Sequence, residues 1–202
     1  KQAEKIANFN NKHLFSRVFL NKKKWFTLNV IGSKNDPIES IAEQIDLTIK
    51  EQWISKGIPA PLKTKTKKTV AGVIKSLNNL IKELNKKGHG LILIVDEMGK
   101  FLDYASSVGS DLNLFQEIAE NFSNTRLNKE GEPIFIGILH QPFEEYASSL
   151  GRSVQEDWQK IQGRFEDIPF SINTEEPANL IAKAIKQKKQ DKNFIKLSND
   201  II

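Results

Sequence analysis

Two adjacent acidic residues, Asp96 and Glu97, directly follow a run of five apolar residues, 91–95. A short apolar run of this kind predicts a buried strand, and ligands of open α/β sheets bind at the carboxyl ends of the strands. Neighbouring side chains on a strand point to opposite faces, so the two carboxylates can have different tasks. One can hold Mg²⁺ on nucleotide phosphates through water, and the other can polarise an attacking water. The alternative is structural: two solvated acids that cap a following helix.

The elements that would position this pair alternate between strands and helices. Strands are predicted over 25–31, 91–95, 134–139 and 165–172. Helices are predicted over 2–9, 38–53, 70–84, 101–105, 112–122, 142–150, 154–161 and 175–188. The runs 91–95 and 134–139 do not alternate in polarity, which is typical of parallel strands covered by helices on both faces. We therefore predict an α/β fold, a three-layer αβα arrangement with a mostly parallel central sheet.

Local signals predict where two of these helices begin or end. Asn35-Asp36 followed by Pro37 is a typical start, because asparagine and aspartate side chains cap free N–H groups and proline fits the first turn. Gly88, after two lysines, is a typical end for the helix over 70–84. We expect residues 1–202 to form one domain, with a core of about 1–172. Residues 173–202 would be a closing helix and the start of a lid or linker.

Composition excludes several classes of function. The 202 residues include no cysteine, which excludes disulfides, thiolate zinc sites and cysteine catalysis. No apolar run approaches the roughly 18 residues of a membrane span, so we expect a cytoplasmic protein with no membrane partner. The net charge of +5 permits an acidic partner such as DNA without requiring one.

The segment from Leu91 to Glu97 resembles the Walker B motif of P-loop NTPases of the ASCE type, which includes AAA+ and STAND ATPases. The resemblance implies ATP and Mg²⁺ as ligands, with Asp96 as the Mg²⁺-associated acid and Glu97 as the catalytic base. The wider run 91–170 is similar to the ATPase core of large bacterial P-loop proteins, some of which act in phage defence or DNA processing. It implies ATP turnover coupled to conformational change in other domains or in a homo-oligomer.

The strand predicted over 134–139 ends before His140 and Gln141. In the AAA+ pattern the strand after Walker B ends in a polar sensor residue near the γ-phosphate, and either residue fits that position. The family more usually has asparagine, threonine or serine there. The alternative for His140 is a hydrogen-bonded structural role.

Arg164 precedes the strand predicted over 165–172, as does the AAA+ arginine that reaches into a neighbour's nucleotide. By this resemblance Arg164 would stabilise charge on the transferring phosphoryl group, and Arg152 is the second candidate. The alternative for Arg164 is a salt bridge to Glu166 or Asp167.

The phosphate-binding loop G-x-x-x-x-G-K-[ST] is absent from the sequence, whose single Gly-Lys pair, Gly99-Lys100, follows the two acids. Two explanations are open. The loop precedes Lys1, with 2–9 as the end of the helix it opens, or the protein is a degenerate NTPase that binds no nucleotide. On either explanation these residues alone should hydrolyse ATP poorly or not at all.

Two other functions therefore compete with an ATPase. One is a catalytically inactive scaffold or interaction module on the same fold. The other is a nucleic-acid-binding module that uses lysine-rich segments. The candidate lysines lie in the loop after Pro61 and in or just after the last predicted helix: Lys63, Lys65, Lys67, Lys68, Lys183, Lys186, Lys188, Lys189 and Lys192.

Overall fold

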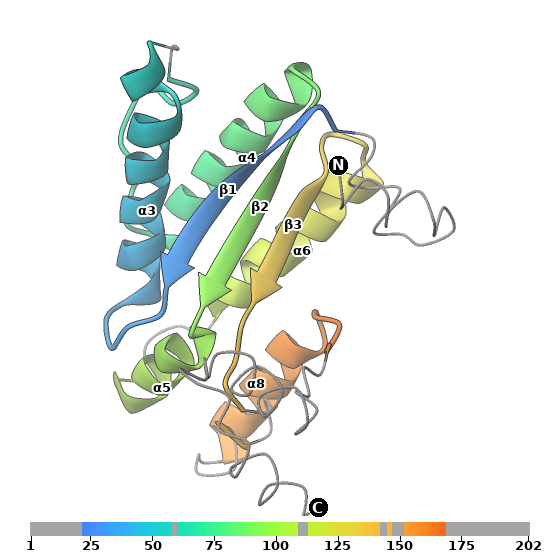
Figure 1. Ribbon diagram of the computed structural model, residues 1–202. Helices are drawn as coiled ribbons and strands as arrows, with labels where there is room; N and C mark the ends of the chain where they lie inside the picture. Colours follow the sequence, from blue (N-terminus) through green and yellow to red (C-terminus); the bar gives the residue numbers. More distant parts are fainter. Residues whose placement is uncertain (1–21, 58–59, 109–112, 142–144, 147–151, 169–202) are drawn as a thin grey trace, which may run out of the picture. The chain divides into compact units, whose positions relative to one another are not determined.

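The computed structural model describes residues 22–57, 60–108, 113–141, 145–146 and 152–168 (Figure 1). The chain divides into two compact units, 1–166 and 167–202. Asp167 and Ile168 are the described residues of the second unit, so the fold below is that of the first. The helices predicted over 2–9 and 175–188 lie outside the described residues, as does most of 142–150.

Three parallel strands form the sheet, in the order β1 (Lys24–Ile31), β2 (His89–Asp96), β3 (Pro133–Gly137). Their register places Leu28, Leu93 and Phe135 side by side, so these side chains share one face. The strand order follows the chain order, as expected for successive crossover connections. The prediction of an α/β fold with a parallel sheet is confirmed for this part of the chain.

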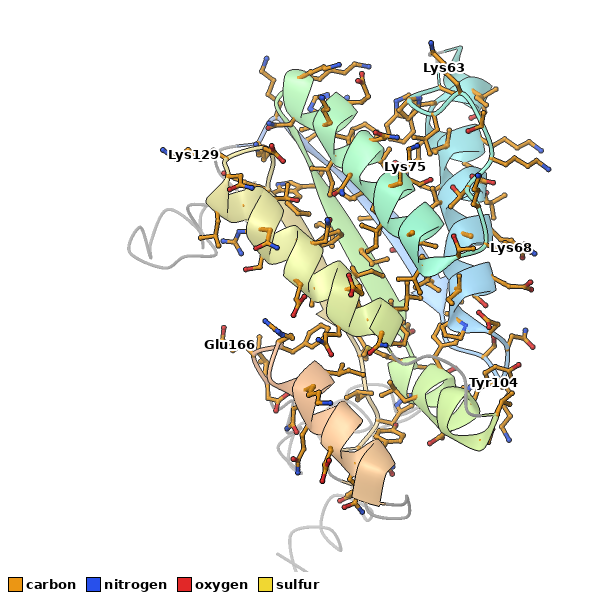
Figure 2. The ribbon with its side chains drawn as sticks, turned by 180° about the vertical axis from the view of Figure 1, so that it is seen from behind. Lys63, Lys68, Lys75, Tyr104, Lys129 and Glu166 are labelled. Carbon is orange, nitrogen blue, oxygen red and sulfur yellow. The ribbon has the colours of Figure 1, made fainter. Side chains whose placement is uncertain are left out.

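Helices α3 (Pro37–Gln52), α4 (Val70–Lys86) and α6 (Asn113–Leu127) form a layer on one face of the sheet, the helix layer. Figures 1 and 2 show α4 and α6 against the same face, and α3 packs on both β1 and α4. The remaining elements are the short η1 (Ile54–Lys56), α5 (Met98–Val108) and α8 (Arg152–Gln162).

Both predicted helix boundaries are confirmed. Asp36 caps α3 by accepting hydrogen bonds from the N–H groups of Ile38 (2.7 Å) and Glu39 (3.2 Å), and Pro37 opens the first turn. Gly88 follows α4 with φ at 71°, a left-handed conformation that glycine adopts without steric cost.

The face of the sheet that meets the helix layer is apolar and closed. Leu28 and Leu93 are 0% exposed there. Four phenylalanines bring α6, β3 and the segment after α8 together, because Phe135 packs against Phe115, Phe122 and Phe165. This packing also explains a difference from prediction. Residues 165–168 of the strand predicted over 165–172 form no strand, since turn hydrogen bonds close α8 and the Phe165 ring lies edge-on to Phe135 at 4.9 Å. Residues 169–172 lie outside the described residues.

The opposite face of the sheet is also apolar, but less covered. Ile136 is 39% exposed and Ile138 42%. Trp25 lies across Gly90 on this face, since a Cβ on Gly90 would sit 2.3 Å from its ring. None of α3, α4 and α6 covers it, so the second helical layer of the predicted three-layer fold stays a prediction. Within the described residues, no helix has the length and hydropathy needed to cross a membrane.

Packing at the centre of β2 should dominate stability. Replacing Leu93 by alanine removes a fully buried side chain and leaves a cavity, so Leu93→Ala should lower the free energy of unfolding by about 3 kcal/mol. The matched control is Leu127→Ala on α6, where the leucine is 75% exposed and the change should stay within about 0.5 kcal/mol. Urea denaturation checks both, and equal losses would contradict the assignment of the core.

Candidate functional site

Asp96 is the last residue of β2 and Glu97 follows it at the carboxyl edge of the sheet. Backbone hydrogen bonds hold this turn from both neighbouring strands. On the β1 side, the N–H of Gly32 donates to the carbonyl of Asp96 at 2.7 Å. On the β3 side, Met98 N–H donates to the carbonyl of Ile138 at 3.0 Å. The two acids are therefore fixed to the ends of all three strands.

Gly32 lies so close to this turn that no side chain fits at its position. A Cβ on Gly32 would sit 2.0 Å from the carbonyl oxygen of Glu97 and 3.0 Å from that of Asp96. Any other residue would push the β1 end away from the turn. The close approach explains why a glycine directly follows β1.

Glu97 adopts a left-handed backbone conformation, with φ at 52°. For a residue with a Cβ this conformation is unfavourable, and such residues concentrate at functional sites. The turn has local hydrogen bonds that support it: the N–H of Glu97 donates to the Asp96 carboxylate at 2.9 Å. Lys100 N–H donates to the carbonyl of Glu97 at 2.9 Å, at the start of α5.

The Glu97 carboxylate contacts two basic groups. One oxygen pairs with the ammonium of Lys100, and the other lies 3.3 Å from Nε2 of His140, beyond β3. Lys100 and then His140 hold the pKa of the Glu97 carboxyl below its usual range, because both favour the charged form. Glu97 is therefore ionised at neutral pH and fixed between two strand ends.

The structure brings some of the predicted site residues together and leaves others apart. Asp96, Glu97 and His140 share the carboxyl edge, and Gln141 follows His140 with an exposed side chain. Arg164 forms an ion pair with Glu120 on α6, where Glu166 or Asp167 was the predicted alternative. Among the described side chains, Arg164 contacts none of the three site residues.

Arg152, the second candidate for the arginine role, is the first residue of α8, and its side chain lies outside the described part of the structure. An arginine that acts on a neighbouring subunit need not contact the site of its own chain. Both arginine roles therefore remain predictions.

Two residues of the site were not predicted. Lys100 pairs with Glu97 at i,i+3 on one helical face, a spacing that the sequence contains and that could have indicated the contact. Gly32 could be found only as a glycine after a strand. Its closeness to Glu97 depends on the pairing of β1 with β2, residues more than sixty positions apart.

The described residues contain no metal site made of protein ligands alone, because no three His, Asp or Glu side chains there lie close enough to bind one ion. Asp96 offers one exposed carboxylate at the edge of the sheet. This fits a Mg²⁺ ion that is held mainly by phosphates and water, as is usual for nucleotide sites, and not one held by protein ligands alone.

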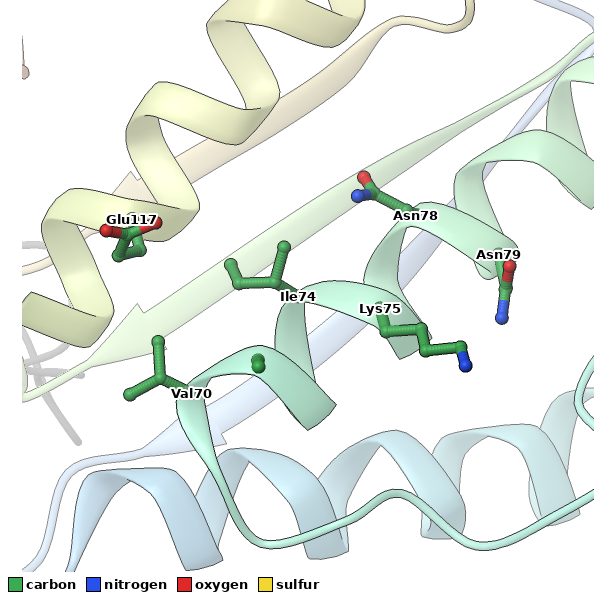
Figure 3. A pocket seen from close by; sticks show the side chains of 7 residues that line it. Val70, Ile74, Lys75, Asn78, Asn79 and Glu117 are labelled. Carbon is green, nitrogen blue, oxygen red and sulfur yellow. The ribbon is translucent and has the colours of Figure 1, made fainter.

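The helix layer also carries an open groove of about 600 Å³ between α4 and α6. Figure 3 shows Val70, Ile74 and Asn78 on one side and Glu117 on the other. None of the predicted site residues lines it. The groove therefore gives no support to the chemistry predicted for Asp96 and Glu97.

Comparison of the sequence with protein-family models found no matching family, and comparisons with curated proteins and with solved structures found no significant match either. The resemblance to P-loop NTPases thus depends on the sequence motifs alone.

The left-handed backbone of Glu97 should cost stability. Glu97→Gly should raise the melting temperature by about 2 to 4 °C, because glycine adopts this φ without steric conflict. Lys129→Gly is the matched comparison and should also raise the melting temperature. Lys129 (φ 59°) is the other described non-glycine residue with positive φ. Thermal melts followed by circular dichroism check both. A fall for Glu97→Gly alone would show that its side-chain contacts outweigh the strain.

The lowered pKa of Glu97 makes the contribution of Lys100 depend on pH. A carboxyl with a lowered folded-state pKa stabilises the fold above its unfolded pKa, and that stability is lost as pH falls through the folded pKa. Lys100→Gln should therefore destabilise the protein at neutral pH and have no effect in strong acid. Lys75→Gln on α4 is the control, and its effect should not change with pH. Denaturation at a series of pH values measures this difference. A Lys100→Gln effect that does not depend on pH would contradict the pair.

Proposed function

We propose that this chain is part of the core of a P-loop ATPase that couples ATP turnover to conformational change. The single observation that supports this best is the contact of His140 with Glu97, next to Asp96, at the carboxyl edge of a parallel sheet. The resemblance to the AAA+ pattern implies a catalytic acid and a sensor on successive strands. The geometry is compatible with that pairing.

In this proposal Asp96 holds Mg²⁺, through water, on the phosphates of bound ATP. The ion would neutralise phosphate charge during transfer. Glu97 orients the attacking water through its ionised carboxylate. Its lowered pKa makes it a weak proton acceptor before the reaction, so it positions and polarises the water more than it deprotonates it.

His140 connects the state of the phosphates to Glu97. It extends from the end of β3, and its side chain is 69% exposed, so a phosphate group can reach it while it keeps its contact with Glu97. Gln141 is the alternative for this sensor role. Loss of the γ-phosphate would then change the contact between the His140 imidazole and the Glu97 carboxylate.

An ATPase of this kind also needs residues that bind the phosphates, and the described residues contain no phosphate-binding loop. The rival function is a scaffold on the same fold with no ATP turnover. The two differ in what Glu97 does.

Glu97→Gln should abolish ATP hydrolysis in the longest natural form of the protein and leave Mg²⁺–ATP binding intact or tighter. The amide keeps the size of the side chain and removes the charge that polarises water. Glu117→Gln on α6 is the control, and it should keep turnover within about twofold, as expected for an exposed residue away from the site. Phosphate release and calorimetric titration with ATP check the two steps. Absence of nucleotide binding in the unaltered protein would favour the scaffold.

A further inference from the structure

The amino edge of the sheet carries a dense group of basic residues that the proposed ATPase site does not use. The strands begin at this edge and helices α4 and α6 end at it, because these helices run opposite to the strands (Figure 1). Figure 2 shows Lys129 at this end. We call this surface the basic edge: Lys22, Lys23, Lys24, Lys82, Lys86, Lys87, Arg126 and Lys129.

Hydrogen bonds hold the three segments of the basic edge together. The N–H of Lys23 donates to the carbonyl of Gly88 at 2.9 Å, which joins the start of β1 to the turn after α4. Asn85 connects α4 to the other two segments: it accepts from the Lys22 ammonium at 3.2 Å and donates to the carbonyl of Glu130 at 2.8 Å. The positive charges therefore lie on one supported surface.

Most of these charges form no ion pair with a described acidic side chain, although Glu83 also lies near Lys82 and Lys87. Lys22 lies 4.0 Å from Glu132, and Lys86 lies 2.6 Å from Glu83. The other basic side chains are exposed, and no acidic side chain within the described ranges forms an ion pair with them. They are Lys23, Lys24, Lys82, Lys87, Arg126 and Lys129.

His89, at the start of β2, has a pKa below its usual range, and the lysines of the basic edge contribute to this shift. Burial lowers the pKa of its imidazole first, and Lys24, Lys23 and Lys87 lower it further because they disfavour a second positive charge there. Lysines from the start of β1 and from the end of α4 thus both lie close enough to His89 to affect its pKa.

Helix dipoles explain only part of this arrangement. Lysine and arginine near a helix carboxyl end are favourable, which accounts for Lys86, Lys87 and Arg126. Lys23 packs beside Gly88, directly after α4, so the carboxyl end of that helix also favours its charge. Lys24 is the first residue of β1 and belongs to no helix end, so its charge adds to the edge without that reason.

We propose that the basic edge binds the phosphate backbone of a nucleic acid. Lysine ammonium groups are compact point charges that pair with phosphates without reading bases, so the binding has little sequence preference. An anionic membrane fits less well, because stable membrane docking usually adds buried apolar area to the electrostatic attraction. Within the three segments 22–24, 82–89 and 126–132, Leu127 is the exposed large apolar side chain.

This surface is independent of the proposed ATPase chemistry. The eight residues of β1 separate the basic edge from the carboxyl edge by roughly 23 Å at about 3.3 Å per residue. It also differs from the lysine-rich loop that the sequence suggested. Binding should therefore persist without ATP and in the Glu97→Gln variant.

The test compares two triple variants with the same loss of charge. Lys23, Lys24 and Lys87 are replaced by glutamine in the first, and Lys63, Lys65 and Lys67 of the loop in the second. Binding of fluorescent duplex DNA and single-stranded RNA of random sequence is measured by anisotropy over a range of salt concentrations. Circular dichroism melts check that both variants fold.

The first variant should bind at least about tenfold more weakly than the unaltered protein, and its salt slope on duplex DNA should fall by about 2.7. The loop variant should stay within about twofold. Equal weakening in both variants would overturn the proposal, because net charge alone would then explain binding. No binding to either nucleic acid at about 50 mM salt would also overturn it. Binding to phosphatidylserine vesicles in place of nucleic acid would do the same.

Discussion

The central strand β2 pairs on both sides, with β1 along its whole length and with β3 from Leu91 to Val95. Its side chains toward the helix layer are buried, with α4 as the helix that packs on β2, and Leu93 has no exposed surface. A strand held in this way cannot shift along its neighbours without losing both pairings and its apolar contacts. The position of Asp96 and Glu97 at the edge of the sheet follows from that constraint.

The same constraint separates two electrostatic environments. Parallel strands place all their carboxyl ends at one edge, where helices begin, and all their amino ends at the other, where helices end. The acids, His140 and Lys100 occur at the first edge. The second has a surplus of lysine. The two proposed functions, one on nucleotides and one on a nucleic acid, therefore use residues at opposite ends of one sheet.

At the first edge, Glu97 combines an unfavourable backbone conformation with the position that the proposed ATPase function requires. Its left-handed backbone is unfavourable, yet β1 and β3 hold the turn through Gly32 and Ile138. The carboxylate is in turn oriented by Lys100 and His140. A side chain held by two partners on a supported turn keeps its direction, which is what a group that orients water requires.

Sequence patterns alone determined the parallel α/β class, because the apolar runs at 91–95 and 134–139 do not alternate and helical periodicity separates them. They also determined the start of α3 and the end of α4, since capping depends on Asp36, Pro37 and Gly88 within a few residues. Asp96, Glu97 and His140 could be named because the apolar runs predict where two strands end, and the resemblance to the AAA+ pattern implies roles for the polar residues there.

Only the tertiary structure decided which of these residues meet. The contact of His140 with Glu97, the close approach of Gly32 and the pairing of Arg164 with Glu120 join residues more than thirty positions apart. The basic edge is a further case, because its lysines come from three segments that are unremarkable when read one by one. Distances across a sheet depend on strand order and register, which burial of the whole chain sets and which no local pattern contains.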